Sequence, residues 1–148
     1  MEIIDVKQSD NLIDEYIKIC NLEWGLNREN MEDYIKIKRN EIINGNKVLS
    51  ILGLIDNNIL IGFVSLFRYD GNERRDLTPW YATMYVKDEY RNHGYSKMLN
   101  DAILNEASLL GYNRVYLKTH LINYYEKFGA KFIHKLDNGE ILYYIDLK

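Results

Sequence analysis

The sequence predicts an α/β domain of the mixed α+β kind, with a central mixed, mostly antiparallel sheet flanked by helices and one βαβ unit. Three observations predict this fold class. The chain has 148 residues, the usual length of one domain, so residues 1–148 are expected to form a single domain. Strand-like runs joined by turn residues predict hairpins in the middle and at the C-terminus. Between them, a strand, an amphipathic helix and a second strand predict two parallel strands joined by a crossover.

The first third of the chain reads as one strand followed by two helices. Residues 2–6 are strand-like, and apolar side chains then recur at helical spacing over residues 10–20. The only cysteine, Cys20, falls on this apolar stripe, which predicts a buried small side chain and no redox chemistry. Asn27 is expected to cap the second helix, which should end at the turn-forming residues 44–46.

The middle of the chain supplies the first hairpin and the βαβ unit. Residues 48–55 and 59–67 are β-rich and are separated by Asp-Asn-Asn, which tolerates the positive φ of a tight hairpin. A charged loop then leads through Pro79 to a strand over residues 80–86, and residues 115–119 are expected to run parallel to it. The helix between these strands should end at Gly111, and its apolar face is predicted to contain Tyr95, Met98, Leu99, Ala102, Ile103 and Leu110.

The last third is expected to contain a short helix and a hairpin. The helix should cover residues 121–128 and end at Gly129, and an Asn-Gly turn should join strands over residues 131–136 and 141–147. The helical spacing turns Tyr125 about 100° away from the core side of the short helix. That core side is predicted to contain Leu121, Tyr124 and Phe128.

Composition narrows the class of partner. The net charge is −3 and the pI is about 5.6, which argues against a nucleic-acid-binding face and favours a neutral or cationic partner. No apolar run approaches the roughly 20 residues of a membrane helix, and no signal peptide is recognisable. We therefore expect a soluble, cytoplasmic protein with no nucleic-acid or membrane partner and no metal.

A polar turn of four residues, Arg91-Asn92-His93-Gly94, separates the strand at residues 80–86 from the following helix. The first amides of a helix lack intrahelical partners and carry the positive end of the helix dipole, so they can hold an anion. Gly94 removes side-chain bulk from the approach, and Arg91 and His93 add donors at its rim. The alternative is an ordinary polar turn with a convenient glycine. The spacing fits neither the P-loop nor the dinucleotide-binding motif.

Two runs of the sequence resemble motifs of one family. The run VKDEYRNHGYSKML, residues 86–99, is similar to the acetyl-CoA signature of the GNAT superfamily of N-acetyltransferases, where Arg/Gln-x-x-Gly-x-Gly/Ala follows a strand and opens a long helix. The run YYEKFGA, residues 124–130, resembles that superfamily's later Tyr-Glu-Lys-x-Gly-Phe motif. The resemblance implies a GNAT-like fold and acetyl-CoA-dependent transfer of an acetyl group to a primary amine of a small molecule or peptide, by direct attack in a ternary complex. The alternative is a non-catalytic acyl-CoA-binding sensor on the same fold.

The same resemblance assigns the coenzyme-binding residues. It implies that the turn and the start of the helix cradle the pyrophosphate, and that the end of the preceding strand pairs with the pantetheine arm and polarises the thioester carbonyl. The strand positions are Tyr85 and Val86, and those of the turn are Arg91, Asn92, His93, Gly94, Tyr95 and Ser96. Ser96 departs from the usual Gly or Ala but is still small, and its hydroxyl could donate to a phosphate. An asparagine often found ahead of the second motif is absent, and Ala130 replaces its Phe, which puts one coenzyme contact and one packing contact in doubt.

Tyr125 matches the tyrosine of the second motif, which implies a general acid for the departing thiolate; the alternative is a half-buried structural aromatic. The residues leave open what removes the proton of the amine. The candidates are Glu23, Asp76, His120 and water, and for each side chain an ordinary polar surface role is the alternative. Trp24 and Trp80 could line the acceptor site or belong to the core. The oligomeric state is also open, with a homodimer as one alternative.

Overall fold

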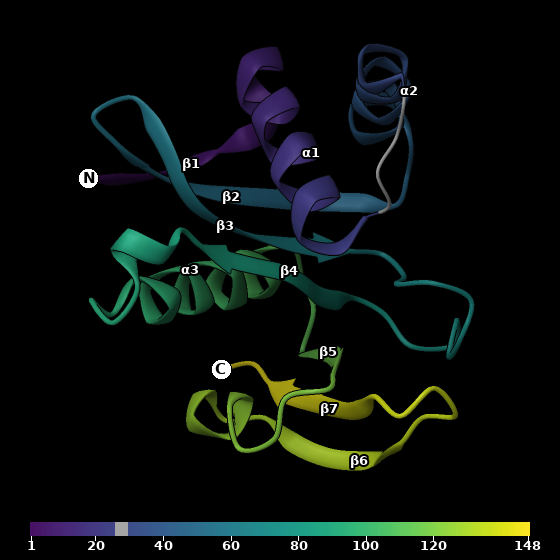
Figure 1. The fold of residues 1–148 in the computed structure, drawn as a ribbon. Coiled ribbons are helices and arrows are strands. Elements are labelled where there is room, and N and C mark those ends of the chain that lie inside the picture. Colours follow the sequence, from purple (N-terminus) through teal and green to yellow (C-terminus); the bar gives the residue numbers. More distant parts are fainter. Residues whose placement is uncertain (26–29) are drawn as a thin grey trace.

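A computed structural model describes residues 1–25 and 30–148 of the chain and confirms the predicted fold class (Figure 1). Within these residues, seven strands form one sheet in the order β1-β2-β3-β4-β5-β7-β6. The strands are β1 (Glu2–Asp5), β2 (Val48–Asp56), β3 (Ile59–Phe67), β4 (Trp80–Val86), β5 (Arg114–Thr119), β6 (Lys131–Lys135) and β7 (Ile141–Asp146). The helices are α1 (Asp10–Trp24), α2 (Met31–Asn44) and α3 (Tyr95–Leu109), with short 3-10 helices η1 (Val6–Gln8), η2 (Asp88–Tyr90) and η3 (Tyr125–Phe128).

Helices α1 and α2 lie on one side of the sheet and α3 lies on the other (Figure 1). Strand β3 is buried from both sides, because Phe63 packs into the core beneath α1 whereas Val64 packs into the core beneath α3. Arg39 of α2 binds Asp14 of α1 through two hydrogen bonds of 2.7 and 2.6 Å, which ties the two helices together. The predicted cap Asn27 lies outside the described residues, and the predicted end of α2 at residues 44–46 is confirmed.

The hairpins and the parallel pair of strands follow the prediction. Asn57 and Asn58 have positive φ values of 49° and 65° at the β2–β3 turn, as a tight hairpin requires. Strand β4 runs antiparallel to β3 and parallel to β5, and β5 is in turn antiparallel to β7. Trp80 belongs to the core, with 1% of its surface exposed. The β4–β5 pair is therefore parallel, and the strand pairs on either side of it are antiparallel.

The predicted apolar face of α3 is partly wrong. Met98 and Leu110 are 41% and 49% exposed, whereas Asn100 is only 2% exposed. The buried residues of α3 are Leu99, Asn100, Ile103 and Ala107. One inward position is therefore filled by an amide, and the apolar pattern alone could not place the buried face correctly.

The predicted helix over residues 121–128 is also wrong. Only η3 is helical, and Leu121 is 51% exposed and not part of the core. Asn123 adopts a left-handed conformation with φ 59°, which no α-helix tolerates, so the chain turns before η3 begins. Gly129, with φ 90°, ends η3 as predicted. As a result Tyr125, and not Tyr124, packs against the main core.

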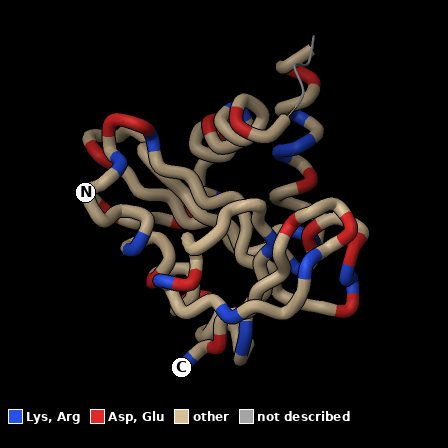
Figure 2. The backbone as a smooth tube through the Cα atoms, turned by 60° about the horizontal axis from the view of Figure 1, so that its bottom comes forward, with Lys and Arg blue, Asp and Glu red and all other residues tan. Residues whose placement is uncertain are grey.

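Basic and acidic residues are interspersed along the chain in the view of Figure 2. Several oppositely charged neighbours form ion pairs, such as Lys97 with Asp101 and Arg114 with Asp146, both at 2.7 Å. Within residues 1–25 and 30–148, no helix combines the length and apolar character that crossing a membrane requires. The same residues contain no group of three or more His, Cys, Asp or Glu side chains that could hold a metal ion.

Candidate active site

Strands β4 and β5 separate at the centre of the sheet. They pair in parallel at Trp80 and Tyr116, where the Tyr116 amide donates to the Pro79 carbonyl at 3.0 Å. Further along, β4 contains one extra residue relative to β3, between Ala82 and Tyr85. Such a bulge bends a strand and increases its twist. Beyond the first pair, the two strands therefore leave a space between them.

The bulge contains a residue with an unusual backbone. Thr83 has φ 51°, a left-handed conformation that a β-branched residue rarely adopts. Its hydroxyl is bonded to the hydroxyls of Tyr16, at 3.2 Å, and of Ser65, and these two are bonded to each other at 2.8 Å. This buried hydroxyl cluster joins α1, β3 and β4. Strained positions of this kind persist only where surrounding contacts hold them, and they are common at functional sites.

Cys20 lies beside the hydroxyl cluster. Burial raises the pKa of its thiol to about 12, so the thiol stays protonated at neutral pH and is a poor nucleophile. Burial likewise raises the pKa of the Tyr16 phenol, the charge of Cys20 adding to the effect. The sequence predicted a buried cysteine, and the structure places Cys20 on the core side of α1 with its side chain partly buried.

A hollow of about 460 Å³ occupies the space between the two strands. Residues 81–84 of β4 and residues 117–119 of β5 form its sides, and Tyr125 of η3 lines it as well. Trp24 and Asp70 reach it from α1 and from the loop after β3. We call this space the central hollow.

A second hollow, of about 470 Å³, lies over the polar turn and is called the turn hollow. Most of the predicted coenzyme-binding residues line it, namely Val86, Arg91, Asn92, Gly94, Tyr95 and Ser96. The other two predicted residues, His93 and Tyr85, do not line the turn hollow. His93 stacks on Tyr95 with ring centroids 5.8 Å apart, and Tyr85 stacks on Phe63 with ring centroids 5.4 Å apart. Met84 borders both this hollow and the central hollow, so the two are adjacent.

The geometry of the turn explains its glycine. Gly94 has φ 81°, and a Cβ placed on it would meet nothing within 4 Å. Gly94 is also the N-cap of α3, so no side chain caps the first amides of that helix. Arg91 braces the turn, since its Nε donates to the Val86 carbonyl at 2.9 Å and its guanidinium pairs with Asp88 at 2.7 Å. The site therefore presents open space in front of uncapped helix amides.

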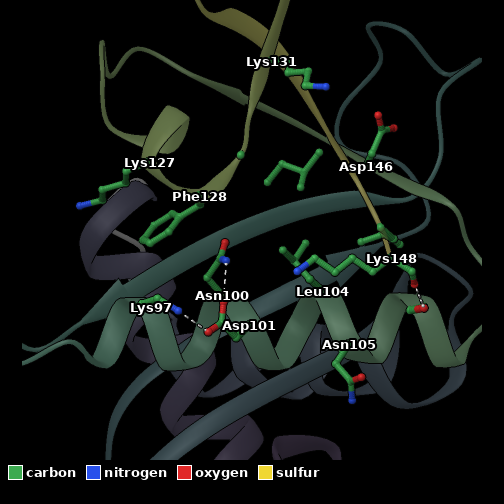
Figure 3. A pocket seen from close by; sticks show the side chains of 14 residues that line it. Lys97, Asn100, Asp101, Leu104, Asn105, Lys127, Phe128, Lys131, Asp146 and Lys148 are labelled. Carbon is green, nitrogen blue, oxygen red and sulfur yellow. Dashed lines mark hydrogen bonds and ion pairs between the residues drawn. The ribbon is translucent and has the colours of Figure 1, made fainter.

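A groove of about 530 Å³ runs beside α3 and is shown in Figure 3. It shares Lys97, Lys127 and Phe128 with the turn hollow, so the two spaces are adjacent. In Figure 3, Asn100 points from α3 toward the groove, and its Nδ2 donates to Asp101 at 3.4 Å. The Asn100 Oδ1 atom is buried and has no hydrogen-bond partner among the described residues.

A fourth hollow, of about 420 Å³, lies between α1, α2 and the end of β3, and is called the helix hollow. Tyr34 and Glu41 of α2 line it on one side. Trp24, Asp70 and Thr83 line both this hollow and the central hollow. The turn, central and helix hollows thus lie next to one another along β4, each sharing lining residues with the next.

Tyr125 stands at the side of the central hollow. Its ring packs edge-on against Tyr81, at 5.8 Å, and against Tyr124, at 4.8 Å. Burial raises the pKa of Tyr125 to about 12, and the hydroxyl has no hydrogen-bond partner within the described part of the chain. The expectation that Tyr124 faces the core is wrong, because Tyr124 lines the turn hollow beneath the Lys127 ammonium, 4.1 Å from its ring centroid.

The candidate proton acceptors lie in different places. His120 lines the central hollow. Asp76 lies elsewhere, paired with Arg74 at 3.0 Å, and this hydrogen-bonded pairing lowers the pKa of its carboxyl. Arg74 in turn contacts His134 of β6 at 2.9 Å, so His134 has a surface role. Glu23 is exposed on α1, where its charge helps burial to raise the pKa of Tyr85.

Sequence reasoning left the place of one residue of the central hollow open and missed another. Trp24 is 54% exposed and lines two hollows, so unlike Trp80 it is not a core residue. Asp70, which lines the same two hollows, was not singled out among the charges of its loop. The available signal was its position three residues after the end of β3, because binding and catalytic residues often lie in the loops that follow central strands.

A profile of the acetyltransferase (GNAT) family matches residues 13–130, which include both motifs and all of the hollows' β4 and β5 residues. The chain belongs to the GNAT acetyltransferase family. The resemblance seen in the two motifs is thereby confirmed. No curated protein sequence matches the chain.

Solved structures share the fold at low sequence identity. The PaiA N-acetyltransferase of Thermoplasma acidophilum, solved with coenzyme A, is 21% identical with a TM-score of 0.67, over 99% of each chain. The aminoglycoside 6′-N-acetyltransferase of Enterococcus faecium is 17% identical with a TM-score of 0.73, over 99% of this chain and 97% of that one. Arabidopsis thaliana NAA60, solved with a bisubstrate analogue, is 16% identical with a TM-score of 0.65, over 99% and 98%. These GNAT structures agree with the fold described above.

Proposed function

We propose that this protein is an acetyl-CoA-dependent N-acetyltransferase that moves an acetyl group to a primary amine of a small molecule or peptide in a ternary complex. The observation that carries the proposal is the row of three adjacent hollows, the turn, central and helix hollows, along β4. A coenzyme entering over the turn and an amine entering between α1 and α2 would meet in the central hollow, beside Tyr125. Direct transfer needs this arrangement, because both substrates must be held together when the bond forms.

The turn hollow suits the coenzyme's pyrophosphate. The uncapped amides at the start of α3 offer donors and the positive end of the helix dipole, and Gly94 leaves the approach open. The pantetheine arm would then follow β4 past Val86 and Met84 into the space between the strands. The coenzyme A bound to the PaiA structure supports this choice of co-substrate. No step of the transfer requires a metal.

The groove beside α3 suits the other end of the coenzyme. Lys97 and Lys127 lie where the groove joins the turn hollow, so their ammonium groups are placed to meet the 3′-phosphate of the adenosine. Lys97 is already paired with Asp101, at 2.7 Å, whereas Lys127 has no ion pair within the described residues and lies over the Tyr124 ring, at 4.1 Å from its centroid. We therefore assign the larger part of the phosphate contact to Lys127.

Tyr125 is proposed as the donor to the departing thiolate. The amine nitrogen attacks the thioester carbon, the carbon–sulfur bond breaks, and the sulfur gains a proton while the nitrogen loses one. A thiol has a pKa of about 8.5, so a phenol with a pKa of about 12 opposes full transfer by about 5 kcal/mol. Tyr125 therefore acts mainly by donating a hydrogen bond as charge develops on sulfur, with the proton following once the nitrogen has become acidic.

The alternative, a sensor that binds an acyl-CoA without turnover, needs the turn and central hollows only. It gives no reason for the helix hollow to open into the central hollow at Trp24, Asp70 and Thr83. The presence of the helix hollow beside the central hollow therefore favours the enzyme. A cytoplasmic location goes with this proposal, because acetyl-CoA would be the co-substrate. The homodimer remains a prediction, which light scattering would test.

The proposal is tested by supplying acetyl-CoA with a panel of primary amines and measuring free thiol and acetylated amine together. Equal amounts of both products, formed at a rate proportional to protein concentration, are expected. Tight binding of acetyl-CoA with no thiol release for any amine would instead support the sensor. Absence of acetyl-CoA binding would contradict both readings.

A further inference from the structure

Asp70 lies at the boundary between the central hollow and the helix hollow, the spaces proposed for the acetyl group and for the amine. It lines both the central hollow and the helix hollow, a position that it shares only with Trp24 and Thr83 among the described residues. Of these three residues, Asp70 alone carries a charge. A group at the boundary between the two hollows would therefore lie beside a carboxylate, with Lys118 of the central hollow and Lys47 of the helix hollow as its charged neighbours.

The carboxylate of Asp70 has no hydrogen bond or ion pair within residues 1–25 and 30–148. The nearby Lys118 ammonium donates to the backbone carbonyl of Asp70, at 2.7 Å, and also lies 5.7 Å from the centroid of the Trp80 ring. Lys47 is directed over the Phe67 ring, at 4.9 Å. Neither lysine forms an ion pair with the carboxylate, although Lys118 lines the central hollow and Lys47 lines the helix hollow, and the half-buried carboxylate lies at the boundary of the two.

The surroundings of Asp70 are those of a binding group. Burial raises the pKa of its carboxyl, and Glu140 adds to this, whereas the charges of Lys118 and Lys47 oppose it. A carboxylate without a partner in such a place costs free energy that an arriving cation would recover. The indole of Trp24 beside it offers an apolar and aromatic face to the carbon chain that bears the cation.

We propose that Asp70 binds the ammonium group of a cationic primary amine, the acceptor, and takes up the proton that this group must lose before it attacks. The inference rests on the proposed function and names its substrate class: alkylammonium acceptors, not neutral aromatic amines. An alkyl amine with a pKa of about 10.4 is neutral in only about one molecule in a few thousand at pH 7, so a group that accepts its proton inside the site has a large effect.

The protons balance in this scheme. The ammonium gives one proton to Asp70, which keeps it through the attack and then releases it to water through the helix hollow. The neutral nitrogen attacks the thioester carbon and the carbon–sulfur bond breaks. The nitrogen, now positively charged, loses its second proton, and the thiolate gains one with the help of Tyr125. The net products are the acetylated amine, the free thiol of coenzyme A and one proton.

The test compares Asp70→Asn with wild type, using diaminobutane as the acceptor. We expect kcat/KM for diaminobutane to fall by about 10²–10⁴-fold near pH 7, while the affinity for acetyl-CoA, measured by calorimetry, stays within about twofold. Asp76→Asn is the matched control, because Asp76 lies in the same loop but lines none of the hollows. Its kcat/KM should stay within about twofold of wild type.

The pH dependence separates this role from a structural one. Asp70→Asn can use only the neutral amine, so its deficit relative to wild type should shrink about tenfold for each pH unit between about pH 7 and 9. The other titratable and charged groups that line the two hollows are present in both proteins, so the effects of those that do not interact with Asp70 cancel in the ratio, whereas Lys47, Lys118 and Glu140 interact with its charge. The full set is Tyr16, Cys20, Tyr34, Lys38, Glu41, Lys47, Tyr81, Lys118, His120, Tyr125 and Glu140.

Three results would overturn the inference while leaving the proposed function intact. They are an Asp70→Asn variant within about threefold of wild type, a deficit that stays constant with pH, and a wild type that binds acetyl-CoA but acetylates only neutral aromatic amines such as aniline. Failure of the wild type to bind acetyl-CoA would instead remove the proposed function, and the inference with it.

Discussion

Replacing Tyr125 with Phe removes one hydroxyl and little else. The ring keeps its edge-on contacts with Tyr81 and Tyr124, at 5.8 and 4.8 Å between ring centroids. The hydroxyl makes no hydrogen bond with any other described residue, so its loss leaves no donor or acceptor unpaired. We therefore expect the free energy of unfolding to change by no more than about 0.5 kcal/mol.

The expected loss of activity follows from the role of the hydroxyl. A hydrogen bond to a group that becomes charged contributes about 1.5–3 kcal/mol, and this one forms only as the thiolate develops. Each 1.36 kcal/mol changes a rate about tenfold, so kcat should fall by about 10- to 150-fold. The affinity for acetyl-CoA should remain near that of wild type.

The assay is thiol release under single-turnover conditions, so that product release does not hide the chemical step. Tyr144→Phe is the control, because Tyr144 is a partly buried tyrosine of β7 that lines none of the hollows. A Tyr125→Phe rate within about threefold of wild type would refute the proposed role of this hydroxyl. An equal loss in Tyr144→Phe would show that the effect is not specific to the site.

Further predictions concern the coenzyme, stability and pH. Gly94→Trp should weaken acetyl-CoA binding at least about 10²-fold in calorimetry with an unchanged far-UV spectrum, and Gly94→Asn should weaken it less, because asparagine tolerates the left-handed φ of 81°. Dephospho-coenzyme A should bind more weakly than coenzyme A, and Lys127→Ala should reduce that difference; an unchanged difference would exclude a 3′-phosphate contact. Because the folded state raises the pKa of Asp70, its ionised form disfavours folding above that pKa, so Asp70→Asn should melt at the same or a higher temperature at neutral pH. With a pKa of about 12 for Tyr125, which must stay protonated to donate, kcat should not decline between about pH 9 and 11; a fall with a midpoint near 10 would contradict it.

The elements set by local chemistry were predicted well from the sequence. Asn57 and Asn58 specify the β2–β3 hairpin because asparagine adopts positive φ at little cost. The start of α3 is fixed by Gly94 in the same way. The resemblance to the GNAT motifs then located the turn hollow, since six of the eight positions it assigned to the coenzyme line that space.

The features set by tertiary contacts were not predictable. Thr83 is a favourable strand residue by propensity, yet it adopts a left-handed conformation in the bulge of β4, where its hydroxyl bonds to Tyr16 and Ser65. A left-handed Asn123 shortened the helix that spacing predicted, and it exchanged the expected roles of Tyr124 and Tyr125 in packing. Asp70 is one charge among several in its loop, and only the fold brings it between two hollows.

One measurement tests most directly whether this chain transfers acetyl groups. The protein is mixed with acetyl-CoA carrying an isotope-labelled acetyl group and with diaminobutane, and both the free thiol and the label on the amine are followed over time by mass spectrometry. We predict that thiol and labelled N-acetyl amine appear together in a one-to-one ratio, and that both are lost with Gly94→Trp. Thiol release without label on any amine, or binding of acetyl-CoA with neither product, would contradict the assignment as an N-acetyltransferase.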